Sequence, residues 1–341
     1  MKKKIAVAIL NWNGKDLLEK YLPSVIEHSK KHNVYVIDND SSDDSVAYIE
    51  SEFPQINIIQ TGKNLGYAGG YNTGLKWIKE EYAVLINSDV RTTPGWLEPI
   101  VKHFNLYPNC GAVQPKILWD RQTDKFEYAG ASGGFIDSFG YPFCRGRVLH
   151  QLEIDRGQYN DAIEVFWATG ACLAVRMQAF NIAGGLDSML FAHMEEIDLC
   201  WRMQRAGYDI WVIPQSTIYH LGGATLNAES PRKTYLNFRN NLIILVKNLP
   251  QFRAIIVVFI RLILDGIAGL KFILEGKPKH ALAILQAHFA FYRRFTKIQR
   301  ARMSLTHLPL LPMKALKGTY KGSMVWQFYA RGVKEFSRFY N

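Results

Sequence analysis

Short apolar segments alternate with helical segments over the first 120 residues, and this alternation leaves few possible folds. The apolar segments are six or seven residues long and almost continuously apolar, which is typical of strands covered on both faces. Strands separated by helices of this length form βαβ units in a mainly parallel sheet. We therefore predict an α/β fold with strands at residues 4–10, 33–38, 56–61 and 82–87 and helices at residues 15–28, 43–53 and 69–81.

The second half of the chain has a less regular pattern. Residues 164–180 predict a strand that runs into a helix, residues 194–208 predict a helix, and residues 209–214 predict a further strand. The composition then changes, and apolar and basic helical segments dominate the rest of the chain. We therefore predict a sheet-containing domain at residues 1–230 and a basic, helical region at residues 231–341.

The basic residues are concentrated in the C-terminal region. Residues 231–341 hold 20 Lys and Arg against 3 Asp and Glu, whereas residues 1–230 hold 21 against 27. Such asymmetry indicates a polyanionic partner, either a nucleic acid or an anionic membrane surface. The sequence contains no recognisable nucleic-acid-binding module. We therefore expect docking to an anionic membrane surface and no nucleic acid partner.

The most apolar stretch, residues 253–274, is about long enough to span a bilayer, which takes roughly 20 residues. Arg261 and Asp265 lie inside it, and a charge at the bilayer centre is costly. The stretch therefore predicts an interfacial helix or a helix buried on its own domain. The four cysteines form no CxxC pair, which favours a reducing compartment. We expect a cytoplasmic protein, peripheral on the inner face of the cell membrane.

Small and polar residues follow each of the four N-terminal strands. Any one of these segments alone would be an ordinary turn, but open parallel sheets bind ligands at the carboxyl ends of their strands. Neither the GxGxxG fingerprint nor the P-loop is present, so the four segments together predict a nucleotide site of another kind. The candidate ligand-binding residues are Asn11, Asn13, Asp38, Asn39, Asn64, Gly66, Asn87 and Ser88.

Asp89 follows the fourth strand and is a candidate metal ligand. Mg²⁺ and Mn²⁺ prefer oxygen ligands and often bind through one or two carboxylates plus substrate phosphates. A cation at Asp89 would bridge a diphosphate and absorb its charge as it leaves. His220, which ends a later strand beside two glycines, is a second candidate ligand, although a lone histidine is more often a core or surface residue.

Three acids begin the helix predicted at residues 194–208, namely Glu195, Glu196 and Asp198. Complementarity to the helix dipole accounts for one or two of them. The alternative is a general base that takes a proton from an attacking hydroxyl. Glu195 and Asp198 can share one helix face, and the choice of base among the three residues stays open.

Six segments occur in the order VAILNWNG, VIDNDSSDDS, KNLGYAGGYNTGL, VLINSDV, ATGACLAVR and FAHMEEIDLCWRMQRAGY, with IYHLGG after the last. Over residues 4–225 this ordered set resembles the inverting family-two glycosyltransferases of the GT-A fold, in particular their rhamnosyltransferase-like bacterial branch. The resemblance implies a Rossmann-like, mainly parallel sheet flanked by helices, followed here by the basic helical region.

The resemblance also implies roles for individual residues. Asp38 matches the acid that contacts the nucleotide base, and Asn64 and Gly66 match the loop lining the nucleotide pocket. The family's Asp-x-Asp metal motif is present as Asn87-Ser88-Asp89, which leaves Asp89 as its metal contact. Glu195 and Glu196 align with the Glu-Asp base motif, although Glu196 is longer than the usual aspartate. His220 matches a position that reaches the metal in some relatives.

The implied reaction is a single displacement. A base deprotonates an acceptor hydroxyl, which attacks the anomeric carbon of a nucleoside-diphosphate sugar while the diphosphate leaves with Mg²⁺ or Mn²⁺. The branch suggests dTDP-rhamnose as donor, with UDP- and GDP-sugars open, and a glycan or lipid-linked acceptor in cell-surface polysaccharide synthesis. The alternative classes are a nucleotidyltransferase, which usually has a basic Gly-rich loop after the first strand, and a nucleic-acid-binding protein.

Overall fold

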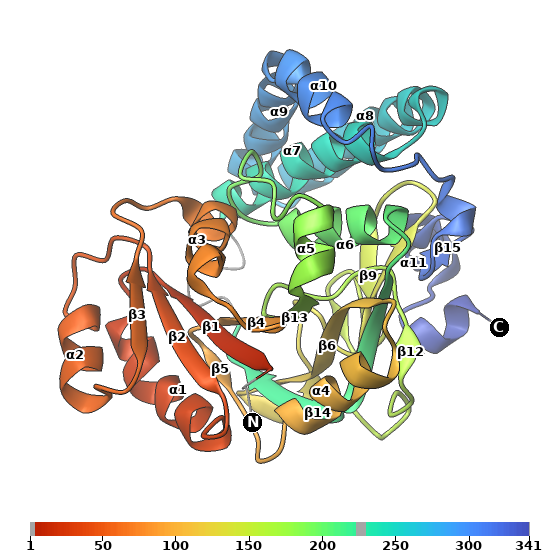
Figure 1. The fold of residues 1–341 in the computed structure, drawn as a ribbon. Helices are drawn as coiled ribbons and strands as arrows, with labels where there is room; N and C mark the ends of the chain where they lie inside the picture. The colour runs from red at the N-terminus through yellow and green to blue at the C-terminus, as the bar shows by residue number, and fades with distance from the viewer. Residues whose placement is uncertain (1–3, 223–229, 341) are drawn as a thin grey trace.

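The computed structural model describes residues 4–222 and 230–340. It contains a large sheet with helices on both faces, a smaller second sheet and a bundle of helices near the C-terminus (Figure 1). The arrangement is the α/β architecture with a helical C-terminal region that the sequence predicts.

The large sheet is parallel in its N-terminal part and mixed beyond it. Its strands are β1 (Ile5–Asn11), β2 (Asn33–Asp38), β3 (Asn57–Gln60), β4 (Tyr82–Asn87), β5 (Val90–Arg91), β6 (Cys110–Trp119), β7 (Gln122–Phe126), β12 (Ile163–Glu164), β13 (Cys172–Arg176) and β14 (Asp209–His220). The order is β12-β14-β6-β13-β4-β1-β2-β3, with β5 beside β14 and β7 beside β6. Strands β3, β2, β1 and β4 are parallel neighbours, whereas β13 is antiparallel to both β4 and β6.

Helices cover both faces of this sheet because successive strand residues point to opposite sides. Val7 and Val84 face one core, which α1 (Lys15–His28), α2 (Ser45–Glu52) and α4 (Leu97–Leu106) complete. Ala8 and Leu85 face the other core. The elements over this second face are α3 (Gly66–Gly74), the 3₁₀ turn η1 (Leu75–Trp77), α5 (Met177–Ile182) and α6 (Glu195–Arg205).

The second sheet was not predicted. It has the order β11-β10-β9-β8-β15 and is built from β8 (Gly134–Asp137), β9 (Pro142–Cys144), β10 (Arg147–Val148), β11 (Gln151–Leu152) and β15 (Thr319–Tyr320). The last strand pairs in parallel with β8. Strand β15 is preceded by η2 (Met313–Ala315) and followed by α11 (Met324–Arg331) and η3 (Phe336–Phe339). Strands of two to four residues carry too little periodicity to be recognised in the sequence.

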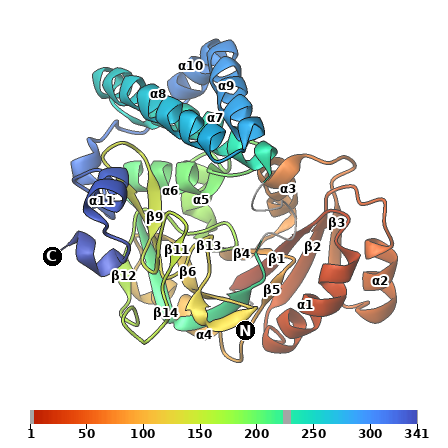
Figure 2. The same cartoon turned by 180° about the vertical axis from the view of Figure 1, so that it is seen from behind.

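The helical bundle contains α7 (Pro231–Asn248), α8 (Gln251–Leu274), α9 (Pro278–Arg293) and α10 (Phe295–Met303). Helix α7 contacts the other three helices and also α6 of the sheet domain. Figures 1 and 2 show the bundle at one end of the molecule, above α3, α5 and α6. Strand β15 and helix α7 follow residue 230 in the chain but pack against elements that precede it. The division into two domains at residue 230 stays a prediction.

Helix α8 buries Arg261 and Asp265 and exposes most of its large apolar residues. Asp265 is buried and lies 3.5 Å from Arg261 Nε and 3.1 Å from His288 Nε2 of α9. The Arg261 guanidinium also lies 3.8 Å from the centre of the Tyr141 ring. No helix within residues 4–222 and 230–340 combines the length and the apolarity needed to cross a membrane.

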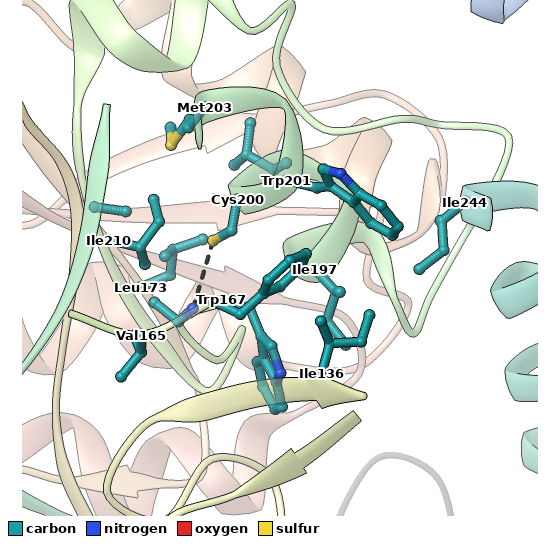
Figure 3. Close-up of a cluster of buried hydrophobic side chains, with 14 of the residues drawn as sticks. Ile136, Val165, Trp167, Leu173, Ile197, Cys200, Trp201, Met203, Ile210 and Ile244 are labelled. Atoms are coloured by element: carbon teal, nitrogen blue, oxygen red, sulfur yellow. Dashed lines mark hydrogen bonds between the residues drawn. The ribbon is translucent and has the colours of Figure 1, made fainter. Parts of the chain in front are cut away.

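Helix α6 is held by a core that joins both sheets to α7. Its residues Ile197, Cys200 and Trp201 pack among Trp167, Ile136 of β8, Leu173 of β13, Ile210 of β14 and Ile244 of α7 (Figure 3). The Ala168 N–H donates to Cys200 Sγ at 3.4 Å. These contacts from four elements fix the direction in which the first turn of α6 presents its acids.

The bounds of a helix and of a strand near the site differ from the prediction. Helix α3 begins at Gly66 and passes into a 3₁₀ turn at Leu75, whereas a helix over residues 69–81 was predicted. Strand β14 continues to His220 past Pro214, because a register irregularity between Ile213 and Thr217 accommodates the proline. This longer strand brings His220 beside Val90, next to Asp89.

Candidate active site

The carboxyl ends of β1, β2 and β4 bring their polar residues to one edge of the sheet. Asn11 is the register partner of Asp38, and Leu10 is the partner of Asn87. Asn11 Nδ2 donates to Asp38 Oδ1 at 3.3 Å, and both side chains are buried. The second oxygen of Asp38 accepts the Ser41 N–H at 3.1 Å. The sheet therefore assembles these predicted donor-binding residues, with Asp38 already held in a fixed orientation.

Two further loops complete this edge. Asn13 lies in the left-handed region, with φ of 49°, and its Oδ1 accepts the Ser42 N–H at 2.7 Å. Asn39 Nδ2 donates to Asn64 Oδ1 at 3.1 Å and to the Gly66 carbonyl at 3.2 Å. These hydrogen bonds join the loops that follow β1, β2 and β3 to one another. The three asparagines therefore shape this edge of the sheet through the loops themselves.

Asp89, His220 and Glu127 form a buried charged triad. His220 Nε2 lies 3.0 Å from Asp89 Oδ1, and His220 Nδ1 lies 3.3 Å from Glu127 Oε1. Burial alone would lower the pKa of His220, but the Glu127 and Asp89 carboxylates raise it to about 10. Asn87 Nδ2 is 3.4 Å from His220 Nε2. No sequence pattern singled out Glu127, which lies just after the short strand β7.

Asp89 and His220 are the two predicted metal ligands, and their Oδ1 and Nε2 atoms lie 3.0 Å apart, the distance of a direct ion pair. A carboxylate on the far nitrogen of a metal-binding histidine, as Glu127 provides, is the usual support for such a ligand. In the described part of the chain, no group of three or more His, Cys, Asp and Glu side chains is arranged to hold a metal ion.

Glu195 and Glu196 begin α6 without hydrogen-bond partners for one oxygen each. The Oε2 atoms of both residues are buried and unpartnered. Burial raises the pKa of Glu196 to about 7. Burial, followed by the charges of Glu196 and Asp198, raises the pKa of Glu195 well above its ordinary value. The Glu195 side chain is buried, whereas that of Glu196 keeps partial solvent access.

Asp198 has a different environment from the two glutamates. It is fully buried and accepts from Arg202 Nε at 2.9 Å, Lys247 Nζ at 2.9 Å and Asn248 Nδ2 at 2.8 Å. Burial alone would raise the pKa of Asp198, but Arg202 and Lys247 hold it well below its ordinary value. The carboxylate therefore ties α6 to α7, and this geometry favours the two glutamates as candidates for the base.

The loop before α6 is strained and is held from α7. Phe191, His193 and Met194 have φ values of 66°, 69° and 73°, which non-glycine residues rarely adopt. Asn240 Nδ2 lies within 3.0 Å of three carbonyl acceptors of the loop, at residues 190, 192 and 193. The sequence did not single out Asn240, since a polar residue in a helix usually faces solvent. Strain of this kind is concentrated at functional sites.

Contacts along residues 170–171 connect the donor edge to the acids of α6. The Gly170 carbonyl accepts from Tyr67 Oη at 2.7 Å, and the Ala171 carbonyl accepts from the Asn87 N–H at 3.1 Å. Burial raises the pKa of Tyr67, and the charges of Glu195 and Glu196 raise it further. Tyr67, in the Gly-rich segment after β3, therefore lies between the strand ends and the two glutamates.

Polar loops at the carboxyl ends of parallel strands are where open α/β sheets bind their ligands, and this edge lies beside the acids of α6. The chain belongs to glycosyl transferase family 2, whose sequence profile matches residues 6–181. The predicted family and fold are thereby confirmed. The match ends before Glu195 and His220, so it does not test the roles of those residues.

Known rhamnosyltransferases are among the relatives. The N-acetylglucosaminyl-diphospho-decaprenol L-rhamnosyltransferase of Mycobacterium tuberculosis is 27% identical over 223 residues, which cover 60% of this chain and 71% of that protein. The dTDP-rhamnosyl transferase RfbF of Shigella flexneri is 25% identical over 308 residues, which cover 84% of this chain and 95% of that protein.

A solved structure shares the fold. The crystal structure of GalNAc-T7 with UDP, GalNAc and Mn²⁺ superposes with a TM-score of 0.58 at 15% sequence identity. The superposition covers 91% of this chain and 59% of the GalNAc-T7 chain.

Proposed function

We propose that this protein is an inverting, cation-dependent glycosyltransferase of cell-surface polysaccharide synthesis. It transfers a sugar from a nucleoside-diphosphate donor, with dTDP-rhamnose as the first candidate, to a glycan or lipid-linked acceptor. The rhamnosyltransferases of M. tuberculosis and S. flexneri support this donor and this class of acceptor. The observation that carries the proposal is the pair of high-pKa glutamates, Glu195 and Glu196, held by a strained loop beside the donor edge.

Glu196 is the proposed general base. A base works best when its pKa lies near the operating pH, and the pKa of Glu196 is about 7. Its carboxylate accepts the proton of the acceptor hydroxyl as the oxygen attacks the anomeric carbon. The bond to the donor diphosphate breaks on the opposite side, so the configuration inverts through an oxocarbenium-like transition state. Glu195 is more deeply buried, and burial together with the charge of Glu196 raises the pKa of Glu195 well above its ordinary value, so Glu195 keeps its proton while Glu196 accepts one.

Asp89 and His220 are the proposed protein ligands of Mg²⁺ or Mn²⁺. A bound cation neutralises the charge that the departing diphosphate develops. His220 would hold the cation through the neutral form of its Nε2 atom, and the Glu127 carboxylate, 3.3 Å from Nδ1, would fix the direction of the ring. Asn87 and Ser88, both partly exposed, line the approach to Asp89.

A panel of nucleotide sugars tests this proposal. The full chain is mixed with dTDP-rhamnose, UDP-sugars or GDP-sugars in Mg²⁺, Mn²⁺ or EDTA, and thermal stabilisation and slow donor hydrolysis are measured. We expect one base to stabilise the chain and to be hydrolysed only with a cation, and NMR of the transfer product to show inverted configuration. Retained configuration, or equal hydrolysis in EDTA, would contradict the mechanism.

We also propose that the outer face of α8 and α9 docks on an anionic membrane. Eleven aliphatic and phenylalanine side chains of these adjacent helices each expose more than half of their surface, namely Phe252, Ile255, Phe259, Ile263, Ile267, Leu270, Ile273, Leu274, Leu282, Leu285 and Phe289. Residues 231–341 carry the excess of basic residues, which complements anionic headgroups at about 1 kcal/mol per residue near the surface. A patch of this kind marks an interaction site in a folded protein.

A further inference from the structure

A basic cavity lies between the loop before α6 and the helical bundle. Its volume is about 820 Å³. None of the proposed donor-binding residues lines it. The lining residues that matter here are Phe191 of the loop, Arg232, Tyr235 and Arg239 of α7, and Arg294 and Lys297 at the start of α10.

Among the residues that the structure describes, the four cations of this cavity have no counter-charge. In residues 4–222 and 230–340, none of them forms an ion pair with a carboxylate. Arg239 is buried and donates instead to the Leu190 carbonyl at 3.0 Å and to Tyr235 Oη at 3.3 Å. Burial would raise the pKa of Tyr235, yet Arg239 and Arg294 lower it overall. Guanidinium groups gathered without an acid are suited to a phosphate ligand.

Phe191 separates the cavity from the donor loop. Its carbonyl accepts the Tyr67 N–H at 3.0 Å, and the Arg232 guanidinium lies 5.8 Å from the centre of its ring. A Cβ atom on Gly66, where φ is +69°, would lie 2.7 Å from the same ring. A ligand in the cavity therefore lies one side chain away from the donor loop and a few residues along the chain from Glu196.

The other side of the cavity lies at the junction of α9 and α10. Arg294 follows α9 directly, and Phe289 and Tyr292 in the last turns of that helix are exposed. A molecule bound to Arg294 and Lys297 can thus extend an apolar chain along α9 and a polar group past Phe191. A free diphosphate would use only the cationic part of this arrangement.

We propose that the cavity binds the diphosphate group of a lipid-linked acceptor, with the lipid along α9 and the acceptor sugar directed towards Glu196. This inference rests on the proposed glycosyltransferase function and specifies its acceptor class. It assigns Arg294, Lys297, Arg232 and Arg239 to the acceptor, whereas the cation at Asp89 and His220 serves the donor.

Binding of farnesyl diphosphate, inorganic pyrophosphate and farnesol by the full chain tests the inference. The donor site is first saturated with dTDP and Mg²⁺, and calorimetry then measures each dissociation constant. The double variant Arg294→Gln, Lys297→Gln removes two cations of the cavity. Arg293→Gln, Arg300→Gln removes two exposed cations from the same helices outside the cavity and is the matched control for net charge.

We expect farnesyl diphosphate to bind more tightly than pyrophosphate or farnesol. The cavity variant should weaken its binding about tenfold or more, because each charge-assisted phosphate contact is strong, and the control variant should bind like the wild type. Equal effects of the two variants, or competition between dTDP and farnesyl diphosphate, would overturn the inference. Failure of every nucleotide to bind would instead refute the proposed donor chemistry while leaving the diphosphate result standing.

Discussion

Glu196 and Asp198 are two residues apart on one helix, and their environments give them opposite proton affinities. Asp198 accepts from Arg202, Lys247 and Asn248, so it stays ionised and structural. Glu196 has no cationic partner among the described residues, and burial raises its pKa to about 7. Carboxyl groups whose pKa values are driven apart by their surroundings commonly divide the structural and the chemical roles between them.

Replacement of Glu196 by glutamine tests the base. We expect Glu196→Gln to lower kcat by at least about a hundredfold, since glutamine cannot accept the proton. Wild-type kcat/KM should rise with pH and level off above an apparent pKa near 7, and this rise should vanish in the variant. Asp198→Asn, which leaves Arg202 and Lys247 without their carboxylate, should chiefly lower the melting temperature. Full turnover in Glu196→Gln would remove its assigned role.

The raised pKa of Glu196 also has a consequence for stability. A carboxyl group whose folded pKa exceeds its unfolded value of 4.5 stabilises the fold at low pH and loses this contribution as the pH rises towards 7. Glu196→Gln should therefore raise the free energy of unfolding at pH 8 by about 1–3 kcal/mol and change it little at pH 4. Urea titrations at both pH values measure this difference, and equal effects would show that Glu196 titrates normally.

The triad of Asp89, His220 and Glu127 makes a separate prediction about the cation. We expect His220→Asn to weaken Mn²⁺ binding in the presence of dTDP at least tenfold. Glu127→Gln should weaken it about 10- to 100-fold, because the ring loses its supporting carboxylate. Mn²⁺ titration followed by electron paramagnetic resonance measures both constants. Glu164→Gln, which disrupts only the distant ion pair with Lys317, is the control. Unchanged Mn²⁺ affinity in His220→Asn would exclude the imidazole as a ligand.

At the scale of elements, α7 acts as a clamp on the loop that precedes α6. The Asn240 amide donates to three carbonyls of the loop, and Arg239 donates to the Leu190 carbonyl. The Lys247 ammonium contacts both Asp198 and Asp187. The strained residues of the loop are over-determined by these contacts, which is the condition for such strain to persist. Helix α7 is therefore part of the site even though it follows the matched family region.

Removal of the Asn240 amide should loosen this clamp. We expect Asn240→Ala to lower the free energy of unfolding by about 1–3 kcal/mol, since it leaves buried carbonyl groups without a donor. It should also lower kcat more than it changes the donor KM, because it displaces Glu196 and not the strand ends. Asn237→Ala, which changes a partly exposed residue on the same helix, is the control. Equal kinetics in the two variants would show that the clamp is dispensable.

At the scale of the whole molecule, the bundle separates an apolar outer surface from a charged interior. Arg261 and Asp265 point towards Tyr141 and His288, while Phe259 and Ile263 face outwards. The bundle stands beside α3, α5 and α6 in both views (Figures 1 and 2). A membrane bound to the outer face of α8 and α9 would place lipid-linked acceptors within reach of the basic cavity.

Flotation with liposomes tests this docking. We expect the full chain to float with anionic vesicles at low salt and to bind more weakly at high salt, because headgroup attraction is screened. Phe259→Ser, Ile263→Ser should abolish most flotation, whereas Trp77→Ser, which alters an equally exposed residue of the sheet domain, should leave it unchanged. Dimerisation of the full chain through the same face, with no flotation, would identify a second copy as the partner.

The local pattern of residues determined the N-terminal half of the fold and the composition of the donor edge. Alternating apolar and helical segments are read directly from the chain, and parallel strands necessarily gather Asn11, Asp38 and Asn87 at one edge. The sequence also determined which acids begin α6, although it left open which of them is the base. These features depend on residues that are close together in the sequence, so a single sequence is enough to predict them.

Only the tertiary structure decided the environments of the charged residues. Glu127, Asn240 and Lys247 reach the site from elements far away in sequence, and no spacing along the chain announces such contacts. The same holds for Arg261 and Asp265 of α8, which face inwards because α7 and α9 supply their partners. Burial and pairing set whether a carboxylate serves as a tether or a base, and both are properties of the folded chain.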